Sequence, residues 1–281
     1  MASTGKTIAT GCGIGCLLLA LVMGGLGTCA VVGIRNVKEK ADDLKVVFKE
    51  LESEYGDVGD YTPAADGHID PARLEVFLAV RDSLLTGGAR AERLMRTLDG
   101  ADGAPAGRLA KVKAGLDLVP AIVTVIDAQV SALRDGGMGL GEYAYIYTLG
   151  YYVLLGEAPG AGPGFTLDRN SDDDDSTVRW SSDSDGDARD QRDRKVRETL
   201  NQAMRAILAN QRAAAIAAGE DGAWTDALDA ELERLNRDYE RLPWQDGLPE
   251  AILVSLAPYR DRLAATWSEY LNALEMVNLQ R

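Results

Sequence analysis

Hydrophobic residues recur every three or four positions along most of the chain, which is the spacing of one face of an α-helix. Stretches with this spacing predict helices at 72–98, 109–133, 190–218, 224–242 and 249–277. Asp70 and Pro71 predict the start of the first, because aspartate caps helices and proline suits their first turn. Gly87–Gly88 and Pro120 are expected to kink or break the first two helices. We therefore expect an all-α fold, a bundle of several long helices.

The N-terminal part of the chain has a different pattern, because no charged side chain occurs between Lys6 and Arg35. A bilayer-spanning helix needs about 20 apolar residues, so the sequence predicts a short tail at 1–6 and a transmembrane helix at 7–34. A cleaved signal peptide has a shorter apolar core, of about 7–15 residues. A lipoprotein signal ending at Cys29 fits poorly, because threonine precedes that cysteine and apolar residues follow it. We therefore expect a single-pass anchor with the lipid bilayer as its partner.

Small residues follow one face of this expected membrane helix. They recur at every fourth position: Cys12, Cys16, Ala20, Gly24 and Thr28. Small side chains allow helices to approach closely in lipid, although glycine is common in membrane helices in any case. The positions expected to support association with a second copy or a membrane partner are Cys16, Ala20, Gly24 and Thr28.

The residues that flank the membrane segment give conflicting signals about orientation. More basic residues follow the segment than precede it, which favours a cytoplasmic C-terminal domain. A very short, lysine-bearing tail before an apolar run is instead typical of a signal anchor that exports the domain. Because Glu39, Asp42 and Asp43 interleave with the basic residues, we favour the extracytoplasmic side.

The segment 35–56 is expected to form a juxtamembrane helix. Its apolar residues alternate at intervals of four and three, as in a coiled-coil seam. They are Val37, Ala41, Leu44, Phe48, Leu51 and Tyr55. The stripe packs either on the following domain or against a second copy. We favour the domain, because a coiled-coil assignment needs three or four heptads.

A tyrosine-rich stretch occupies 142–156 and carries no charge after Glu142. Tyr143, Tyr147 and Tyr151 share one face of a helix, whereas Tyr143, Tyr145 and Tyr147 alternate as in a strand. Because helices are predicted on both sides and no partner strand is evident, we expect a buried helix.

An acidic segment at 158–189 separates the two halves of the soluble domain. It holds the aspartate run 172–175 and very few aliphatic residues. Such a composition cannot bury enough apolar surface to offset its loss of entropy, so the sequence predicts disorder. The helical halves are then 57–157 and 190–281, which we expect to form one domain.

The composition of the chain excludes several classes of function. The net charge of the 281 residues is −14, and no basic patch is present, which argues against a nucleic-acid partner. All three cysteines lie within the expected membrane segment. The soluble part therefore has no disulfide framework, no thiol nucleophile and no cysteine-based metal site.

Few residues carry the signature of a catalytic or metal site. His68 is the single histidine, which is insufficient for a zinc site without cysteines. The residues around it resemble the middle of a calcium-binding loop, but Thr62, Ala64 and Arg73 occupy positions where acidic ligands belong. No phosphate-binding glycine loop or hydrolase elbow is present. We expect no catalytic residues, no metal and no cofactor.

Polar residues in apolar surroundings are the remaining candidates for a site. A pocket for a small ligand is expected to use Arg81, Glu142, Tyr143, Tyr147 and Tyr151. The interpretation that we favour for these residues is structural, because an acid suits the first turn of a helix and tyrosines pack in cores. The favoured function is a membrane-anchored helical interaction or scaffold module, without catalysis, for a protein partner or a second copy. The alternative is a membrane-tethered, ligand-binding or sensory domain built on the tyrosine helix.

Overall fold

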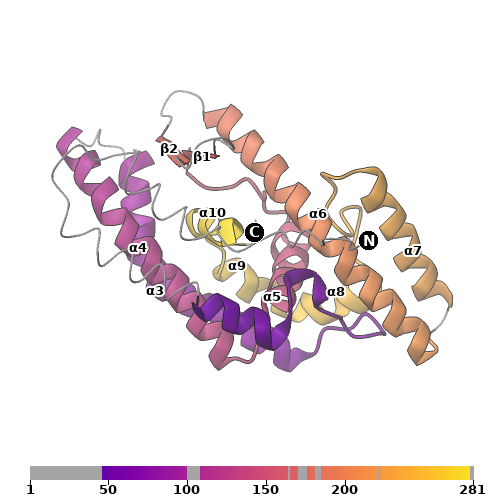
Figure 1. Cartoon of the computed structure of the whole chain (residues 1–281). Helices are drawn as coiled ribbons and strands as arrows, with labels where there is room; N and C mark the ends of the chain where they lie inside the picture. Colours follow the sequence, from indigo (N-terminus) through magenta and orange to yellow (C-terminus); the bar gives the residue numbers. More distant parts are fainter. Residues whose placement is uncertain are drawn as a thin grey trace, which may run out of the picture.

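The computed structural model describes residues 46–99, 108–163, 165–169, 176–180, 185–220 and 222–278. These residues form a mainly helical bundle (Figure 1), as the sequence predicts. The expected tail and membrane helix, with Cys16, Ala20, Gly24 and Thr28, lie outside the described residues. Within the described ranges, no helix combines the length and the apolar character needed to cross a membrane.

The described chain begins with the second part of the expected juxtamembrane helix, at 46–55. Phe48 and Leu51 from its apolar stripe are buried in the core, and Tyr55 packs against that core. This part of the stripe packs on the bundle, in agreement with the favoured interpretation.

Helices α3 (Pro71–Asp99) and α4 (Arg108–Asp135) form a long pair on one side of the molecule (Figure 1). The predicted start of α3 is confirmed, since the Asp70 carboxylate accepts the backbone N–H of Ala72 at 2.8 Å. Neither helix breaks at Gly87–Gly88 or Pro120, where the sequence predicts a kink or a break. A Cβ on Gly88 would lie 2.6 Å from the side chain of Leu271, so this glycine permits close packing instead of ending the helix.

The tyrosine-rich stretch forms α5 (Leu140–Tyr147), which continues directly into the π-helix η2 (Thr148–Leu154). Every residue of α5 is buried. A helix buried on all sides lies in the interior of its domain. The prediction of a buried helix is confirmed, and the strand alternative does not occur.

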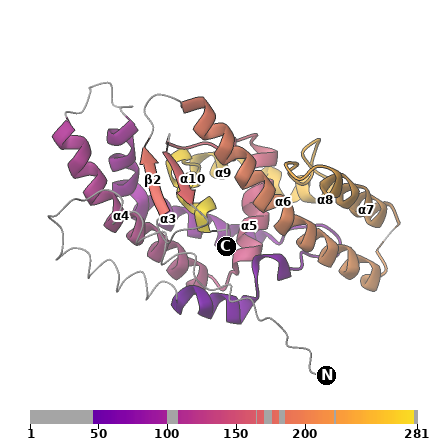
Figure 2. The same ribbon diagram turned by 45° about the horizontal axis from the view of Figure 1, so that its top comes forward.

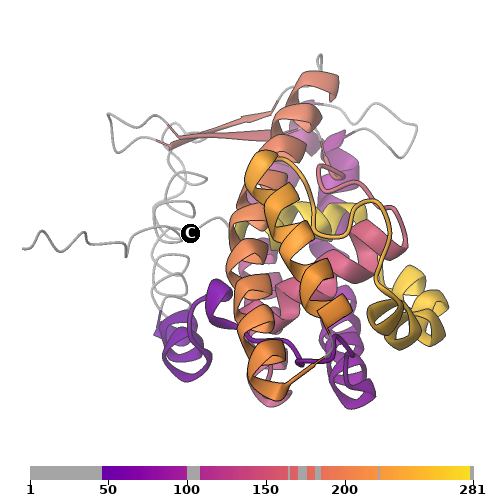
Figure 3. The same ribbon diagram turned by 90° about the vertical axis from the view of Figure 1, so that its right-hand side faces the viewer.

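Helices α6 (Asp185–Ala218) and α7 (Gly222–Arg237) run side by side (Figure 3). Gly219 ends α6 with a φ of +74°. The N–H of Glu220 then donates to the carbonyl of Ala215 at 3.0 Å. Glycine suits this position because a left-handed residue commonly closes a helix C-terminus.

The predicted helix 249–277 is divided into four pieces. These are α8 (Glu250–Leu256), the 3-10 turn η3 (Ala257–Tyr259), α9 (Arg260–Ala265) and α10 (Glu269–Asn278). Pro258 lies in η3, where it lacks the N–H that a continuous α-helix would use. The prediction of one long helix is therefore wrong, although its overall extent is close.

The segment 158–189, for which the sequence predicts disorder, contains described secondary structure, whereas its aspartate run at 172–175 lies outside the described residues. Strands β1 (Phe165–Arg169) and β2 (Ser176–Trp180) pair as an antiparallel hairpin near the start of α6 (Figure 2). Helix α6 begins four residues before the predicted boundary at residue 189. The apolar residues of the strands alternate with polar ones, a strand pattern that the acidic composition of the segment obscured.

Candidate functional site

Arg81 lies on α3 and is completely buried. Its Nε donates to the Tyr151 hydroxyl at 2.9 Å, and its Nη1 donates to the Tyr143 hydroxyl at 3.1 Å. Its Nη2 donates to the backbone carbonyl of Thr266 at 2.8 Å. Nη1 also donates to the carboxylate of Glu275, which completes a buried ion pair. We call Arg81, Tyr143, Tyr151, Thr266 and Glu275 the arginine cluster.

Glu275 is the member of this cluster with a charged side chain that sequence reasoning missed. It lies on α10, and its side chain is only 1% exposed. The hydroxyl of Tyr143 donates to its second oxygen, Oε2, at 2.9 Å. A signal was present in the sequence, because steps of four residues from the apolar Trp267 and Leu271 lead to position 275. A charge at that step is expected to be buried with a partner.

Aromatic rings surround the guanidinium of Arg81. Its Cζ lies 5.2 Å from the ring centre of Tyr147 and 5.1 Å from that of Tyr151. These distances allow a favourable interaction between the cation and the ring faces. Trp267 packs against one of these rings, with its ring centre 5.1 Å from that of Tyr151.

Asn272 forms a second polar junction on α10. Its Oδ1 accepts from the hydroxyls of Tyr147 at 2.9 Å and Tyr152 at 2.6 Å. Its Nδ2 donates to the carbonyls of Pro159 at 3.0 Å and Ala161 at 2.9 Å. Asn272 therefore joins α10 to the tyrosine helix and to the segment that follows it.

The protonation states of Arg81 and the buried tyrosines are fixed at neutral pH. Burial raises the pKa of Tyr143 and of Tyr147 well above the usual value for tyrosine. Burial alone would lower the pKa of Arg81, but Glu275 and the tyrosines raise it to well above its ordinary value. Neutral tyrosines and a permanent cation do not exchange protons near pH 7, so these groups do not suit general acid–base catalysis.

Glu142 does not join the other candidate residues. Its carboxylate pairs with Arg73 at 2.7 Å from Nε and 2.6 Å from Nη2. Arg73 also donates to the carbonyl of Gly137 at 2.9 Å, just beyond α4. The structure thus brings together Arg81, Tyr143, Tyr147 and Tyr151. It assigns Glu142 to a separate, structural pair between α3 and α5.

His68 lies beside Ser255, with 3.4 Å between Nδ1 and Oγ. The serine hydroxyl donates to the carbonyl of Ala251 at 2.8 Å and accepts from the N–H of Ile69 at 3.0 Å. A nucleophilic serine has to give its proton to a base, whereas this proton is held by a carbonyl. The pair therefore fixes a loop and does not form a catalytic dyad.

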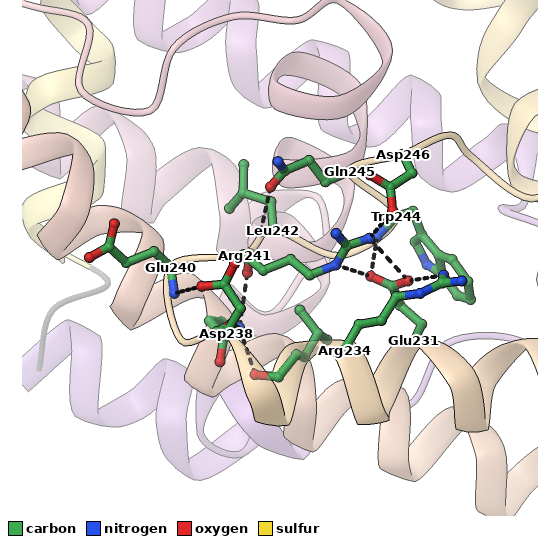
Figure 4. Close-up of polar contacts among 11 residues, drawn as sticks. Glu231, Arg234, Asp238, Glu240, Arg241, Leu242, Trp244, Gln245 and Asp246 are labelled. Carbon is green, nitrogen blue, oxygen red and sulfur yellow. Dashed lines mark hydrogen bonds and ion pairs between the residues drawn. The ribbon is translucent and has the colours of Figure 1, made fainter.

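A second buried carboxylate, Glu231 on α7, organises the loop that follows that helix (Figure 4). Its Oε1 accepts from the backbone N–H of Trp244 at 2.9 Å and from Arg241 Nε at 3.2 Å. Its Oε2 accepts from Arg234 Nη1 at 3.0 Å. Trp244 has a φ of +57°, which is rare for a bulky residue. The bonds to Glu231 account for the persistence of this conformation. The role of the group is to hold the loop.

Two further findings bear on these residues. Among the residues that the structure describes, no group of three or more His, Cys, Asp or Glu is placed to hold a metal ion. Comparisons of the chain with protein-family models, with curated proteins and with solved structures found no match. The roles of the buried residues therefore rest on their own geometry.

Proposed function

We propose that this chain is a membrane-anchored helical module that binds another protein and catalyses no reaction. The observation that carries the proposal is an uncovered apolar surface on α8 and η3. The proposal also includes the anchor at 7–34 and the location of the bundle on the extracytoplasmic side.

Four apolar residues form this surface, which we call the α8 face: Leu253, Val254, Ala257 and Pro258. All four are exposed, with Leu253 at 42% and Val254 at 57%. Their spacing places them on one side of the helix, and no charged residue occurs between Glu250 and Arg260. Single exposed hydrophobic residues are normal, whereas a contiguous apolar patch marks an interaction site.

The occupant that we propose for the α8 face is an apolar surface of a different protein. The net charge of the chain is −14, so two copies repel each other through their acidic surfaces. An uncharged partner surface meets no such barrier. Association of two copies through Cys16, Ala20, Gly24 and Thr28 is a separate proposal that concerns the membrane segment alone.

Hydrogen bonds also attach the loop after helix 46–55 firmly to the bundle. The loop after helix 46–55 is held at its carbonyls by Asn210 at 3.0 Å from Gly59, Gln211 at 2.9 Å from Ala64 and Trp224 at 2.6 Å from Ala65. These side chains come from α6 and α7. They fix helix 46–55, which follows the proposed anchor in the sequence, relative to the bundle.

The ligand-binding alternative receives no comparable support. Arg81 donates to Tyr143 and Tyr151, and both Arg81 and Tyr143 donate to Glu275. Tyr147 donates to Asn272, and Glu142 pairs with Arg73. A ligand would therefore have to displace Glu275, a buried part of the same chain, from the guanidinium of Arg81.

Photo-crosslinking in native membranes tests the proposed function. A photoreactive amino acid at Ala257 is expected to give one discrete adduct whose added mass differs from that of a second copy. The double substitution Leu253→Ser/Val254→Ser is expected to remove the adduct. The same reagent at Glu233, whose side chain is 68% exposed on α7, serves as the matched control and is expected to give none.

Three outcomes would contradict the proposal. They are the absence of any adduct at Ala257, an adduct at twice the monomer mass, and an adduct that survives the double substitution. A reporter fused to the C-terminus, assayed on both sides of the membrane, tests the orientation separately.

A further inference from the structure

The arginine cluster has the composition of a receptor for a carboxylate. Two separate donors address the two oxygens of Glu275, since Arg81 Nη1 donates to Oε1 and the Tyr143 hydroxyl donates to Oε2 at 2.9 Å. Charge-assisted bonds of this kind are stronger and shorter than neutral ones. A carboxylate carried by any other molecule of suitable size would meet the same two donors.

The receptor side of this pair is held independently of Glu275. Arg81 Nε is bonded to Tyr151 at 2.9 Å, and Nη2 is bonded to the Thr266 carbonyl at 2.8 Å. The Tyr151 hydroxyl lies 2.8 Å from the Thr266 hydroxyl, which fixes that ring in turn. These bonds keep the guanidinium oriented when the carboxylate is changed, and a binding group locked by its neighbours is pre-organised.

We infer that Arg81 and Tyr143 form a carboxylate-binding socket, and that Glu275 on the C-terminal helix α10 is its built-in ligand. Shortening Glu275 to alanine removes the carboxylate and leaves space where it lay. The socket then binds a small free carboxylate, formate or acetate, in its place. In the unaltered protein the socket is filled and binds neither.

The charge of Arg81 explains why the Glu275→Ala variant is expected to bind an anion. Arg81 is fully buried, and an unpaired buried cation is strongly unfavourable. A formate ion that binds the folded state and not the unfolded state raises the melting temperature by mass action. The effect requires both a negative charge and two acceptor oxygens, so chloride and neutral formamide do not reproduce it.

The test is thermal unfolding of the full chain in detergent micelles, monitored by tryptophan fluorescence. Glu275→Ala is expected to melt below the unaltered protein, and sodium formate is expected to raise its melting temperature in a saturable way. Sodium chloride at equal ionic strength and formamide serve as controls for screening and for solvent effects. The unaltered protein and Glu275→Gln, whose amide fills the socket, are expected not to respond specifically to formate.

A second variant tests the role of Tyr143. In Glu275→Ala/Tyr143→Phe, the half-saturating formate concentration is expected to rise about tenfold, the factor that corresponds to one hydrogen bond. If Glu275→Ala does not fold after expression, its refolding from urea is compared in formate and in chloride. A larger folded fraction in formate supports the socket.

The inference is overturned if formate and chloride shift the melting temperature of Glu275→Ala equally. It is likewise overturned if formate acts equally on the unaltered protein, if Tyr143→Phe leaves the half-saturating concentration unchanged, or if refolding is indifferent to the anion. None of these results depends on the α8 face, so they leave the proposed function to its own test.

Discussion

Tyr143 and Tyr152 each donate a hydrogen bond to a side chain of α10, but their acceptors are placed differently. Glu275 Oε2 accepts from the hydroxyl of Tyr143, and it belongs to a buried charge. Asn272 Oδ1 accepts from both Tyr152 and Tyr147, so it keeps one donor when the other is removed. Equal chemical changes at the two tyrosines therefore have unequal consequences.

Tyr143→Phe is expected to lower the free energy of unfolding by about 1–3 kcal/mol, because a buried charged acceptor loses a donor. Tyr152→Phe, the matched control, is expected to lower it by less, since Asn272 stays paired with Tyr147. Urea unfolding in detergent micelles measures both. Equal losses, or a larger loss for Tyr152→Phe, would contradict this ranking.

The sequence predicted part of this cluster for a physical reason. Periodicity assigns a residue to a helix face, and it correctly places Arg81 and the four-residue steps Tyr143, Tyr147 and Tyr151 on buried faces. Periodicity does not say which faces meet. The sequence therefore groups Glu142 with its neighbours although its partner is Arg73. The pairing of Glu275 with Arg81, 194 residues away, does not follow from periodicity either.

At the scale of elements, the end of α7 depends on one buried carboxylate. Glu231 and Glu233 lie on the same helix and both pair with arginine. The side chain of Glu231 is fully buried, whereas Glu233 and its partner Arg237 are each 68% exposed. Buried and exposed ion pairs differ greatly in their contribution to stability.

Glu231→Gln is expected to lower the free energy of unfolding by about 1.5–3 kcal/mol, the range for hydrogen bonds to charged groups. It is also expected to speed hydrogen exchange at the Trp244 amide, whose acceptor is Glu231 Oε1. Glu233→Gln is expected to change neither quantity noticeably, because its pair is solvated. Similar effects of the two substitutions would show that the buried group does not hold the loop.

The last helix of the described chain is also an internal one. Six consecutive residues of α10, from Tyr270 to Glu275, are buried, and Figure 1 shows α10 between the α3–α4 pair and α6. The first half of the chain therefore lacks part of its core until the C-terminal residues are in place.

A chain that ends at Trp267 is expected to lose cooperative unfolding and resistance to protease. The variant Leu253→Ser/Val254→Ser is expected to retain both, since its substitutions are at exposed positions. Limited proteolysis and thermal melting make the comparison. A truncated chain that melts like the full one would contradict the internal role of α10.

Element boundaries followed from the sequence where capping residues and long periodicity agreed, as at the start of α3. They failed in two places where local backbone chemistry prevailed. Pro258 divided a continuous apolar pattern, and strand pairing ordered part of an acidic segment. Composition reports the average tendency of a segment and does not detect a short alternating pattern within it.

At the scale of the whole molecule, the tyrosine helix makes stability sensitive to alkaline pH. Burial raises the pKa of Tyr143, Tyr145, Tyr147, Tyr151 and Tyr152 above the ordinary value of 10.0. Each of these hydroxyls keeps its proton in the folded state at a pH where the unfolded chain loses it. The folded state then binds more protons, so stability falls as pH rises.

The contribution of these tyrosines is fully present below pH 10 and is expected to be lost as the pH rises through their folded-state pKa values. Each adds up to about 1.4 kcal/mol of destabilisation per pH unit above the unfolded pKa. Melting temperatures measured between pH 8 and pH 12, with tyrosinate absorbance at 295 nm, provide the test. Ionisation of these five tyrosines near pH 10 in a chain that stays folded would contradict their burial.

The buried charged and tyrosine residues stabilise the fold, whereas the proposed function rests on the α8 face and the proposed anchor. Arg81 and Glu275 are compatible with the folded state only as a pair. A substitution that leaves either charge buried without its partner therefore destabilises the protein, whereas apolar replacement of both residues is tolerated.

The most direct measurement is a double-mutant cycle with Arg81→Met and Glu275→Leu, analysed by urea unfolding of the full chain in detergent micelles. We predict that each single substitution lowers the free energy of unfolding by about 3–5 kcal/mol, because its partner remains buried and unpaired. The double substitution is predicted to cost far less than the sum of the two. Losses that simply add, or single substitutions with little effect, would contradict the account.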